Sequence, residues 1–364
     1  MKPISLRSGH KIFFSTRWQI AATYIGTVVG AGFASGQEIL QFFAAFGGWG
    51  LAGILAASLG FSILGAYILV LGFKVQASSH QPLFSLICGK IPGKLVDLVV
   101  TLFLFMSMVV MLAGVGAISR EHLGLPETWG IAATLIVALI TVLFGLQGVM
   151  TANSLIIPLM VILTIGISCY SLNYHGFVLS DLSRTAPQLA ITGNWLLAAV
   201  LYLSYNLILA VPVLGPMGSH PPNLPFLISG GLIGGVVLGL LSLLQALVLM
   251  AHFPAVTQYQ IPMLYIVRPY ASVFRLLYAL ILWGEIFTTL ISCVFGFAQR
   301  LTALGGVTFR QLAVGSLFVA ALFSRIGFST LVGTVYPLVG YAGLIFVLGL
   351  VYRLVSHGAK SETL

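Results

Sequence analysis

Two carboxylates of this sequence, Glu38 and Glu285, lie inside long apolar segments. An ionisable side chain inside a membrane is costly and is a functional candidate by default. Glu38, beside Gln37, could cap a helix, or it could serve a gate or a proton-linked site. Glu285 could brace neighbouring helices, balance the charge of a bound cation, or exchange protons.

The five other carboxylates fall near predicted helix ends or in loops. Asp97 is expected to reach the membrane interface beside Lys94. A solvated position is the default for the remaining four, which are Glu121, Glu127, Asp181 and Glu362.

The stretch GTVVGAGFASGQE (26–38) surrounds the first of these carboxylates with glycines at 26, 30, 32 and 36. Glycine accepts unusual dihedrals and leaves the backbone open to a ligand, so this stretch predicts a break in a membrane helix. Unsatisfied backbone groups are expensive in hydrocarbon, and a break therefore persists where it lines a polar cavity or binds something. The alternative is close helix packing through the G-x-x-x-G spacing at 26 and 30.

The residues that follow predict that the helix restarts. Ser35-Gly36-Gln37-Glu38 has the S-x-x-E form of a capping box, with Ser35 as the N-cap. A second half-helix is then expected from about Gly36 to Phe46. Its N-terminus would suit an anionic group such as a carboxylate, and the carbonyl end of the first half-helix would suit a cation such as sodium.

The composition defines the setting of these residues. Of the 364 residues, 59% are hydrophobic and 6% are charged, with a mean hydropathy of +1.10, which indicates a polytopic membrane protein without a soluble domain. The net charge of +9 does not indicate nucleic-acid binding, because the basic residues are scattered singly at helix ends. The three cysteines have no metal-like spacing.

Hydropathy predicts ten membrane-spanning helices. Their approximate limits are 17–46, 48–73, 94–118, 129–147, 152–172, 194–216, 225–251, 270–299, 309–323 and 329–354. If both termini are cytoplasmic, eleven of the sixteen Lys and Arg residues lie inside, which obeys the positive-inside rule. Two outer loops are long, and the apolar one at 252–269 could be a lid over a vestibule or an ordinary linker.

Ten spans divide into two halves of five, and an odd number per half inverts the second half in the membrane. The halves open similarly, with WQIAATY at Trp18 and WLLAAVLY at Trp195. Pro212, Gly215 and Pro216 predict a mid-membrane break in the sixth span as well. The expected organisation is a tail (1–16), a first repeat (17–172), an outer loop (173–193), a second repeat (194–354) and a tail (355–364).

Three segments together resemble the YkvI-type bacterial membrane proteins of the amino acid–polyamine–cation superfamily. They are GTVVGAGFASGQEILQFF, LSYNLILAV and GEIFTTLISC, and the resemblance covers the whole chain. It implies an all-α LeuT fold of ten transmembrane helices in a 5+5 inverted repeat, with helices 1 and 6 broken at mid-membrane. It also implies alternating access and a location in the bacterial cytoplasmic membrane with both termini inside.

The resemblance further implies a sodium site between the first break and the eighth helix. Its ligands would be the carbonyls of Gly26, Val29 and Glu285 and the hydroxyls of Thr288 and Thr289. Phe33 stands where related symporters often have an asparagine, which puts a second sodium in doubt. The fifth span has no lysine to replace the ion, and this favours sodium.

A substrate site is expected beside the same break. Gly30, Ala31 and Gly32 leave space there, and Phe33 adds bulk. By analogy with the sixth helix of the fold, Ser204, Tyr205 and Asn206 would line the pocket, although these polar groups could instead join helices.

The sequence therefore predicts a sodium-coupled secondary transporter of a small organic solute, an amino acid or a related compound. The alternatives are a proton-coupled carrier that uses Glu285 or Glu38, and a transporter-like sensor without turnover. An enzyme is disfavoured because the spans lack H-E-x-x-H and any serine–histidine or paired-aspartate arrangement. Apart from sodium no cofactor is expected, and the partners are a small molecule and the lipid bilayer.

Overall fold

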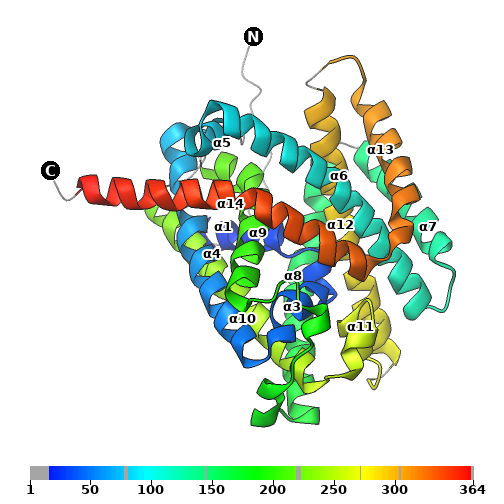
Figure 1. Cartoon of the computed structure of the whole chain (residues 1–364). Coiled ribbons are helices and arrows are strands. Elements are labelled where there is room, and N and C mark those ends of the chain that lie inside the picture. Colours follow the sequence, from blue (N-terminus) through cyan, green and yellow to red (C-terminus); the bar gives the residue numbers. More distant parts are fainter. Residues whose placement is uncertain are drawn as a thin grey trace.

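The computed structural model describes residues 16–77, 81–143, 146–218, 223–270, 272–302 and 305–361, and every regular element in these ranges is a helix (Figure 1). The first half contains α1 (Thr16–Val28), α2 (Ala31–Ala34), α3 (Gln37–Phe42), η1 (Ala44–Phe46), α4 (Gly48–Val75), α5 (Gln81–Cys88), α6 (Lys90–Glu121), α7 (Glu127–Leu143) and α8 (Leu146–His175). The second half contains η2 (Leu179–Ser183), η3 (Pro187–Leu189), α9 (Trp195–Gly218), α10 (Leu224–Ala251), η4 (Ala255–Gln258), α11 (Pro262–Ile266), α12 (Ser272–Thr302), α13 (Phe309–Phe323), η5 (Ser324–Ile326) and α14 (Phe328–Ser361).

The first apolar segment is broken at the glycines. The last hydrogen bond of α1 runs from the Val29 N–H to the Ile25 carbonyl, and the next turn starts from the Gly30 carbonyl, which accepts from Ala34. A second interruption follows at Gly36, whose φ of 81° is left-handed. Glycine is required there for a further reason, because a Cβ would lie 2.8 Å from Cγ of Met263. The predicted break is therefore present.

The predicted capping box is wrong. Gly36, and not Ser35, is the N-cap of α3, and the Ser35 hydroxyl donates to the Gly32 carbonyl at 2.9 Å while accepting from the Gln37 N–H at 3.2 Å. The Glu38 side chain turns away to α9. The left-handed turn at Gly36 shifts the start of the helix by one residue, and a tertiary contact outcompetes the local cap for the carboxylate.

The predicted break in the sixth span is also wrong. α9 is continuous from Trp195 to Gly218, through Pro212 and Gly215. A proline removes one backbone donor and disturbs one turn, and a membrane helix tolerates this when its neighbours compensate. In the described residues, therefore, the first span of the first half is broken and the first span of the second half is continuous.

Seven helices in the described ranges are long and apolar enough to cross a membrane: α4, α6, α9, α10, α12, α13 and α14. α7 is apolar but shorter. Apolar side chains are exposed on these helices, for example Leu59, Leu102 and Leu348, as expected for surfaces that face lipid. α14 continues to Ser361 and projects beyond its neighbours (Figure 1), so the predicted tail from 355 begins as helix. Of the predicted tail at 1–16, residues 1–15 lie outside the described residues, and Thr16 begins α1.

The core is held by a glycine face of α10 that packs against α4 and α1. A Cβ at Gly231 or Gly235 would lie within 2.6 Å of α4 backbone atoms, and one at Gly234 would lie 2.6 Å from the Tyr24 ring. Small residues let membrane helices approach closely enough for extensive van der Waals contact. The α1 segment that carries the break is thereby fixed against a rigid pair of helices.

A partly buried ion pair joins the two halves of the molecule. Asp97 of α6 accepts hydrogen bonds from Arg300 of α12, with Nε at 3.2 and 3.0 Å from its two oxygens and a further bond from the guanidinium. Asp97 is therefore paired between helices, where the sequence indicated an interfacial residue beside Lys94.

The α10 glycine face yields a test with a matched control. Gly235→Ala should lower the free energy of unfolding by about 1–3 kcal/mol, because its Cβ would lie 2.3 Å from Ser62 N. Gly315→Ala in α13 has nothing within 4 Å of its Cβ and should leave the melting temperature unchanged or raise it slightly. Thermal unfolding in detergent measures both, and equal stabilities for the two variants would contradict this packing.

Candidate functional site

Glu38 lies at the centre of the candidate site, 3% exposed. Its Oε2 accepts a hydrogen bond from the Tyr205 hydroxyl of α9, and the Phe33 backbone also donates to the carboxylate. The side chain folds back over Gly32, where a Cβ would lie 2.0 Å from Oε1. Gly32 is therefore needed for the carboxylate to sit at the break.

Aromatic rings from three helices pack around Tyr205, which donates the hydrogen bond to this carboxylate. The Tyr205 ring lies 5.1 Å from that of Tyr336 in α14, 5.6 Å from Tyr202 and 5.7 Å from Phe42, measured between centroids. Tyr202 and Tyr205 are at most 2% exposed, so the cluster is closed in this structure. We call these four rings the tyrosine cluster.

One of the predicted sodium ligands of α12, Thr289, lies against the other side of the break. The Thr289 hydroxyl is 3.7 Å from the Cβ position of Gly30. Thr288 is fully buried, and its hydroxyl donates to the Glu285 carbonyl at 3.0 Å. Gly26 and Val29 bracket the carbonyl end of α1 at the same break. These predicted ligands are all oxygen donors, the chemistry that a hard cation prefers.

The Glu285 side chain is 1% exposed, and its Oε2 has no hydrogen-bond partner among the described residues. A buried carboxylate oxygen without a partner is expensive unless it binds a proton or a cation. This favours the charge-balance or proton interpretation of Glu285 over that of a hydrogen-bonded brace.

The structure does not bring all three predicted α9 residues to the break. The Ser204 hydroxyl donates to the Gly340 carbonyl of α14 at 2.8 Å, and the Asn206 amide donates to the Tyr202 carbonyl at 3.0 Å. These contacts match the interhelical and local roles that the sequence left open. Of the three, Tyr205 contacts the α2–α3 segment through Glu38.

Gln37 and Gln41 join α3 to the start of α14. Their amide nitrogens lie 2.6 and 3.3 Å from the Ser329 hydroxyl. Tyr278 of α12 donates to the Ala34 carbonyl at 2.7 Å. Ser329 and Tyr278 were missed by sequence reasoning, because single polar residues in apolar helices give no periodic signal.

The apolar loop at 252–269 covers the break. In α11, Met263 and three neighbours are buried, and the Met263 N–H donates to the Ser35 carbonyl at 3.0 Å. Gln260 ties the loop to two helices: its N–H donates to Glu121 of α6 at 3.2 Å, and its side-chain oxygen accepts from the Phe328 N–H at 2.8 Å. The geometry is that of a lid, the first of the two interpretations of 252–269.

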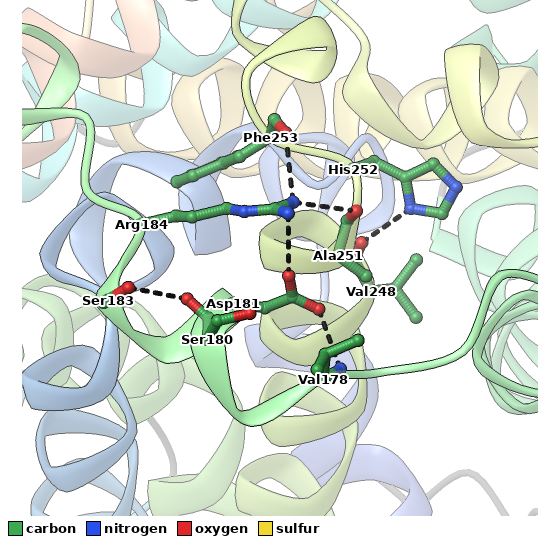
Figure 2. Close-up of polar contacts among 9 residues, drawn as sticks. All are labelled: Val178, Ser180, Asp181, Ser183, Arg184, Val248, Ala251, His252 and Phe253. Atoms are coloured by element: carbon green, nitrogen blue, oxygen red, sulfur yellow. Dashed lines mark hydrogen bonds and ion pairs between the residues drawn. The ribbon is translucent and has the colours of Figure 1, made fainter.

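A second cluster anchors the beginning of this lid (Figure 2). Arg184 pairs with Asp181 at 3.1 Å and donates to the Ala251 and Phe253 carbonyls at 3.4 and 3.2 Å. Asp181 also accepts from the Val178 N–H at 3.0 Å and is 3% exposed. The expectation that Asp181 is solvated is wrong, because the loop folds its carboxylate under the end of α10.

His252 begins the lid beside this anchor. Its Nδ1 lies 2.9 Å from the Val248 carbonyl, and its ring is 4.4 Å from that of His175, centroid to centroid. Burial lowers the pKa of His252, and the His175 ring lowers it further. The Val248 carbonyl and the Asp181 carboxylate act in the opposite direction.

Comparison with solved structures defines the class of protein. The fold matches MhsT in complex with L-phenylalanine (TM-score 0.69, 15% identity, 93% of this chain and 89% of that chain). It also matches inward-facing Mhp1 (0.64, 14%, 91% and 75%) and a Na⁺-coupled sialic acid symporter (0.60, 12%, 92% and 78%). The chain is thus a multi-pass membrane protein with the LeuT fold that these transporters share.

Sequence comparison defines the family. The chain is 34% identical over 331 residues to the membrane protein YkvI of Bacillus subtilis (strain 168), covering 90% of this chain and 93% of the relative. It is 29% identical over 336 residues to YyaD of the same organism, covering 91% and 95%. The chain belongs to the YkvI family. No family model matches it.

A double-mutant cycle tests the dependence of Glu38 on Gly32. Gly32→Ala should lower the melting temperature, because the new methyl group displaces a buried carboxylate from its donors. In a Glu38→Ala background the obstacle is gone, and the same substitution should cost much less. The coupling free energy is expected at about 1–3 kcal/mol. Additive effects of the two substitutions would show that the two residues are not in contact.

The lowered pKa of His252 predicts a pH dependence of stability. The folded protein binds a proton at His252 less readily than the unfolded chain does. The contribution of neutral His252 to the free energy of unfolding is therefore complete above the ordinary pKa of 6.5, and it is lost as the pH falls below that value. Melting temperatures between pH 8 and pH 5, within the range where histidine is the natural titrating group, should fall more steeply for the wild type than for His252→Gln. Parallel curves would contradict this assignment.

Proposed function

We propose that this protein is a secondary active transporter of a small organic solute, an amino acid or a related compound, driven by sodium through alternating access. The observation that carries the proposal is the broken first helix with the Thr289 hydroxyl 3.7 Å from the Cβ position of Gly30. Sodium coupling is supported by the fold shared with a Na⁺-coupled symporter, although that likeness is one of fold alone.

In the proposed mechanism, sodium is held by the Gly26, Val29 and Glu285 carbonyls with Thr288 and Thr289. The solute would bind beside Gly30, Ala31, Gly32 and Phe33, facing Tyr205, once the Glu38 side chain that lies over Gly32 moves aside. Because both sites share the break, ion binding stabilises the backbone geometry that the solute requires. The contacts of Gln37 and Gln41 with Ser329 and the α11 lid would close the outer side.

The finer architecture belongs to the same proposal. It comprises ten spans in a 5+5 inverted repeat, with both termini inside the bacterial cytoplasmic membrane. α1 to α3 would form the first span, α7 the fourth and α8 the fifth, in addition to the seven long apolar helices. The excess of Lys and Arg on the inner side supports the orientation.

A second candidate, a proton-coupled carrier, is favoured by one observation. Glu285 has a buried carboxylate oxygen without a partner among the described residues, and Glu38 is a second buried carboxyl at the break. A transporter-like sensor that binds without turnover would use the same site.

The purified protein should melt at a higher temperature in NaCl than in KCl of equal ionic strength. The stabilisation is about 1.4 kcal/mol when sodium is tenfold above its Kd. Thr289→Ala should abolish the difference, and Thr289→Ser, which keeps the hydroxyl, should retain it. In proteoliposomes that contain the wild type, an inward sodium gradient should drive uptake from a defined amino-acid mixture.

Three outcomes separate the alternatives. The coupling ion would be a proton and not sodium if the melting temperature is the same in both salts and uptake follows pH. That uptake should then be lost in Glu285→Gln or Glu38→Gln. Sodium-dependent stabilisation without uptake of any solute would favour the sensor. If sodium stabilises Thr289→Ala as much as it stabilises the wild type, the sodium site does not include α12.

A further inference from the structure

Two histidines from separate helices meet at the beginning of the lid. His175 is the last residue of α8, and His252 is the C-cap of α10 and the first residue of the lid. Their ring centroids are 4.4 Å apart, and the ring planes are inclined at 57°. His175 is exposed, so a small ion can reach the pair from water. The fold alone brings the two residues together, because they are far apart in the sequence.

The hydrogen bond of His252 determines which of its ring nitrogens has a free lone pair. Nδ1 lies 2.9 Å from the Val248 carbonyl, which can only accept, so Nδ1 carries a proton (Figure 2). In the neutral ring the lone pair is then on Nε2. This nitrogen is buried and has no hydrogen-bond partner among the described residues. Metal-binding histidines are held in the same way, since a backbone carbonyl on one nitrogen fixes the tautomer and presents the other nitrogen to the ion.

The separation of the rings and the charge beside them favour a divalent cation. Two imidazoles that bind one tetrahedral Zn²⁺ with Zn–N bonds of about 2.0–2.1 Å have centroids about 5 Å apart. The separation of 4.4 Å reaches that value after a movement of less than about 1 Å. The negative charge of Asp181 acts on His252, while its two oxygens are held by Arg184 and the Val178 N–H. Asp181 therefore attracts a cation without serving as its ligand.

From this geometry we propose that His175 and His252 form a binding site for a late first-row divalent cation such as Zn²⁺. No group of three or more His, Cys, Asp or Glu that could hold a metal occurs in the described part of the chain, so water would complete the four ligands. Binding is therefore weaker than at a structural zinc site, where all four ligands are protein groups. Imidazole suits such ions, whereas Mg²⁺ and Ca²⁺ select oxygen ligands. The site does not depend on the proposed transport function or on its sodium site.

A bound ion would join the beginning of the lid to the end of α8. Arg184 already holds this point, since it donates to the carbonyls of Ala251 and Phe253 on either side of His252. The ion would add a link from a second helix through His175. It should therefore restrain the loop at 252–269, which covers the break.

Zinc binding to the purified full chain in a KCl buffer tests the site at about pH 7.5, where histidine is mostly neutral. After treatment with EDTA and its removal, titration calorimetry should show one Zn²⁺ bound per chain, and Mg²⁺ should not bind. Zn²⁺ at tenfold above the measured Kd should raise the melting temperature by about 2 °C or more. Amide hydrogen exchange over 252–269 should become slower when Zn²⁺ is bound.

Variants of the exposed partner provide a matched pair. His175→Gln removes the imidazole and should weaken the Kd for Zn²⁺ by about tenfold or more, whereas His175→Glu supplies a carboxylate ligand and should recover part of the affinity. His252→Gln should have the same effect as His175→Gln. His122→Gln changes another histidine at a helix end, the C-cap of α6, and should leave the Kd unchanged.

The proposal is wrong if the wild type does not bind Zn²⁺, if Mg²⁺ binds equally well, or if His175→Gln and His252→Gln both keep the wild-type Kd. If His252→Gln fails to fold, the comparison of His175→Gln with His175→Glu and His122→Gln decides, because His175 is exposed. Unchanged hydrogen exchange over 252–269 with Zn²⁺ bound would contradict the link between the site and the lid.

Discussion

The constraint on which this structure depends is the cost of a broken helix inside a membrane. Backbone groups freed at residues 29–36 have no water to bind and must find partners in the protein. The Ala34 carbonyl accepts from Tyr278, the Ser35 carbonyl accepts from Met263, and the Gly32 carbonyl accepts from the Ser35 hydroxyl. The break therefore fixes the positions of α12 and the α11 lid, since each supplies a donor that the break requires.

The same constraint ties the lid to the part of α12 that carries Thr289. α12 contributes Tyr278 to one side of the break and Thr289 to the other, about three turns apart on one helix. The lid holds the break through Met263 and holds α6 and α14 through Gln260. A change of backbone geometry at Gly30 would thus reach the loop at 252–269 through direct contacts. These contacts would couple the proposed site to the lid.

Charge burial organises the remaining polar residues. Asp97 and Asp181 each have an arginine partner supplied by another segment or by the same loop, near the ends of helices. Glu38 and Glu285 have no basic partner in the described residues and lie within the apolar interior. The difference separates carboxylates that are paired with an arginine from buried carboxylates without a counter-charge.

The sequence by itself determined the membrane class, most helix limits and the break at the glycines. Apolar length and glycine content are local properties, and the bilayer leaves few ways to satisfy a backbone. Only the tertiary structure decided that α9 is continuous, that Ser204 and Asn206 bond to neighbouring carbonyls, and that Tyr205 reaches Glu38. It also decided that Glu38 does not cap α3. Each of these polar groups could bond to more than one partner, and the choice came from helices that meet only when the whole bundle has packed.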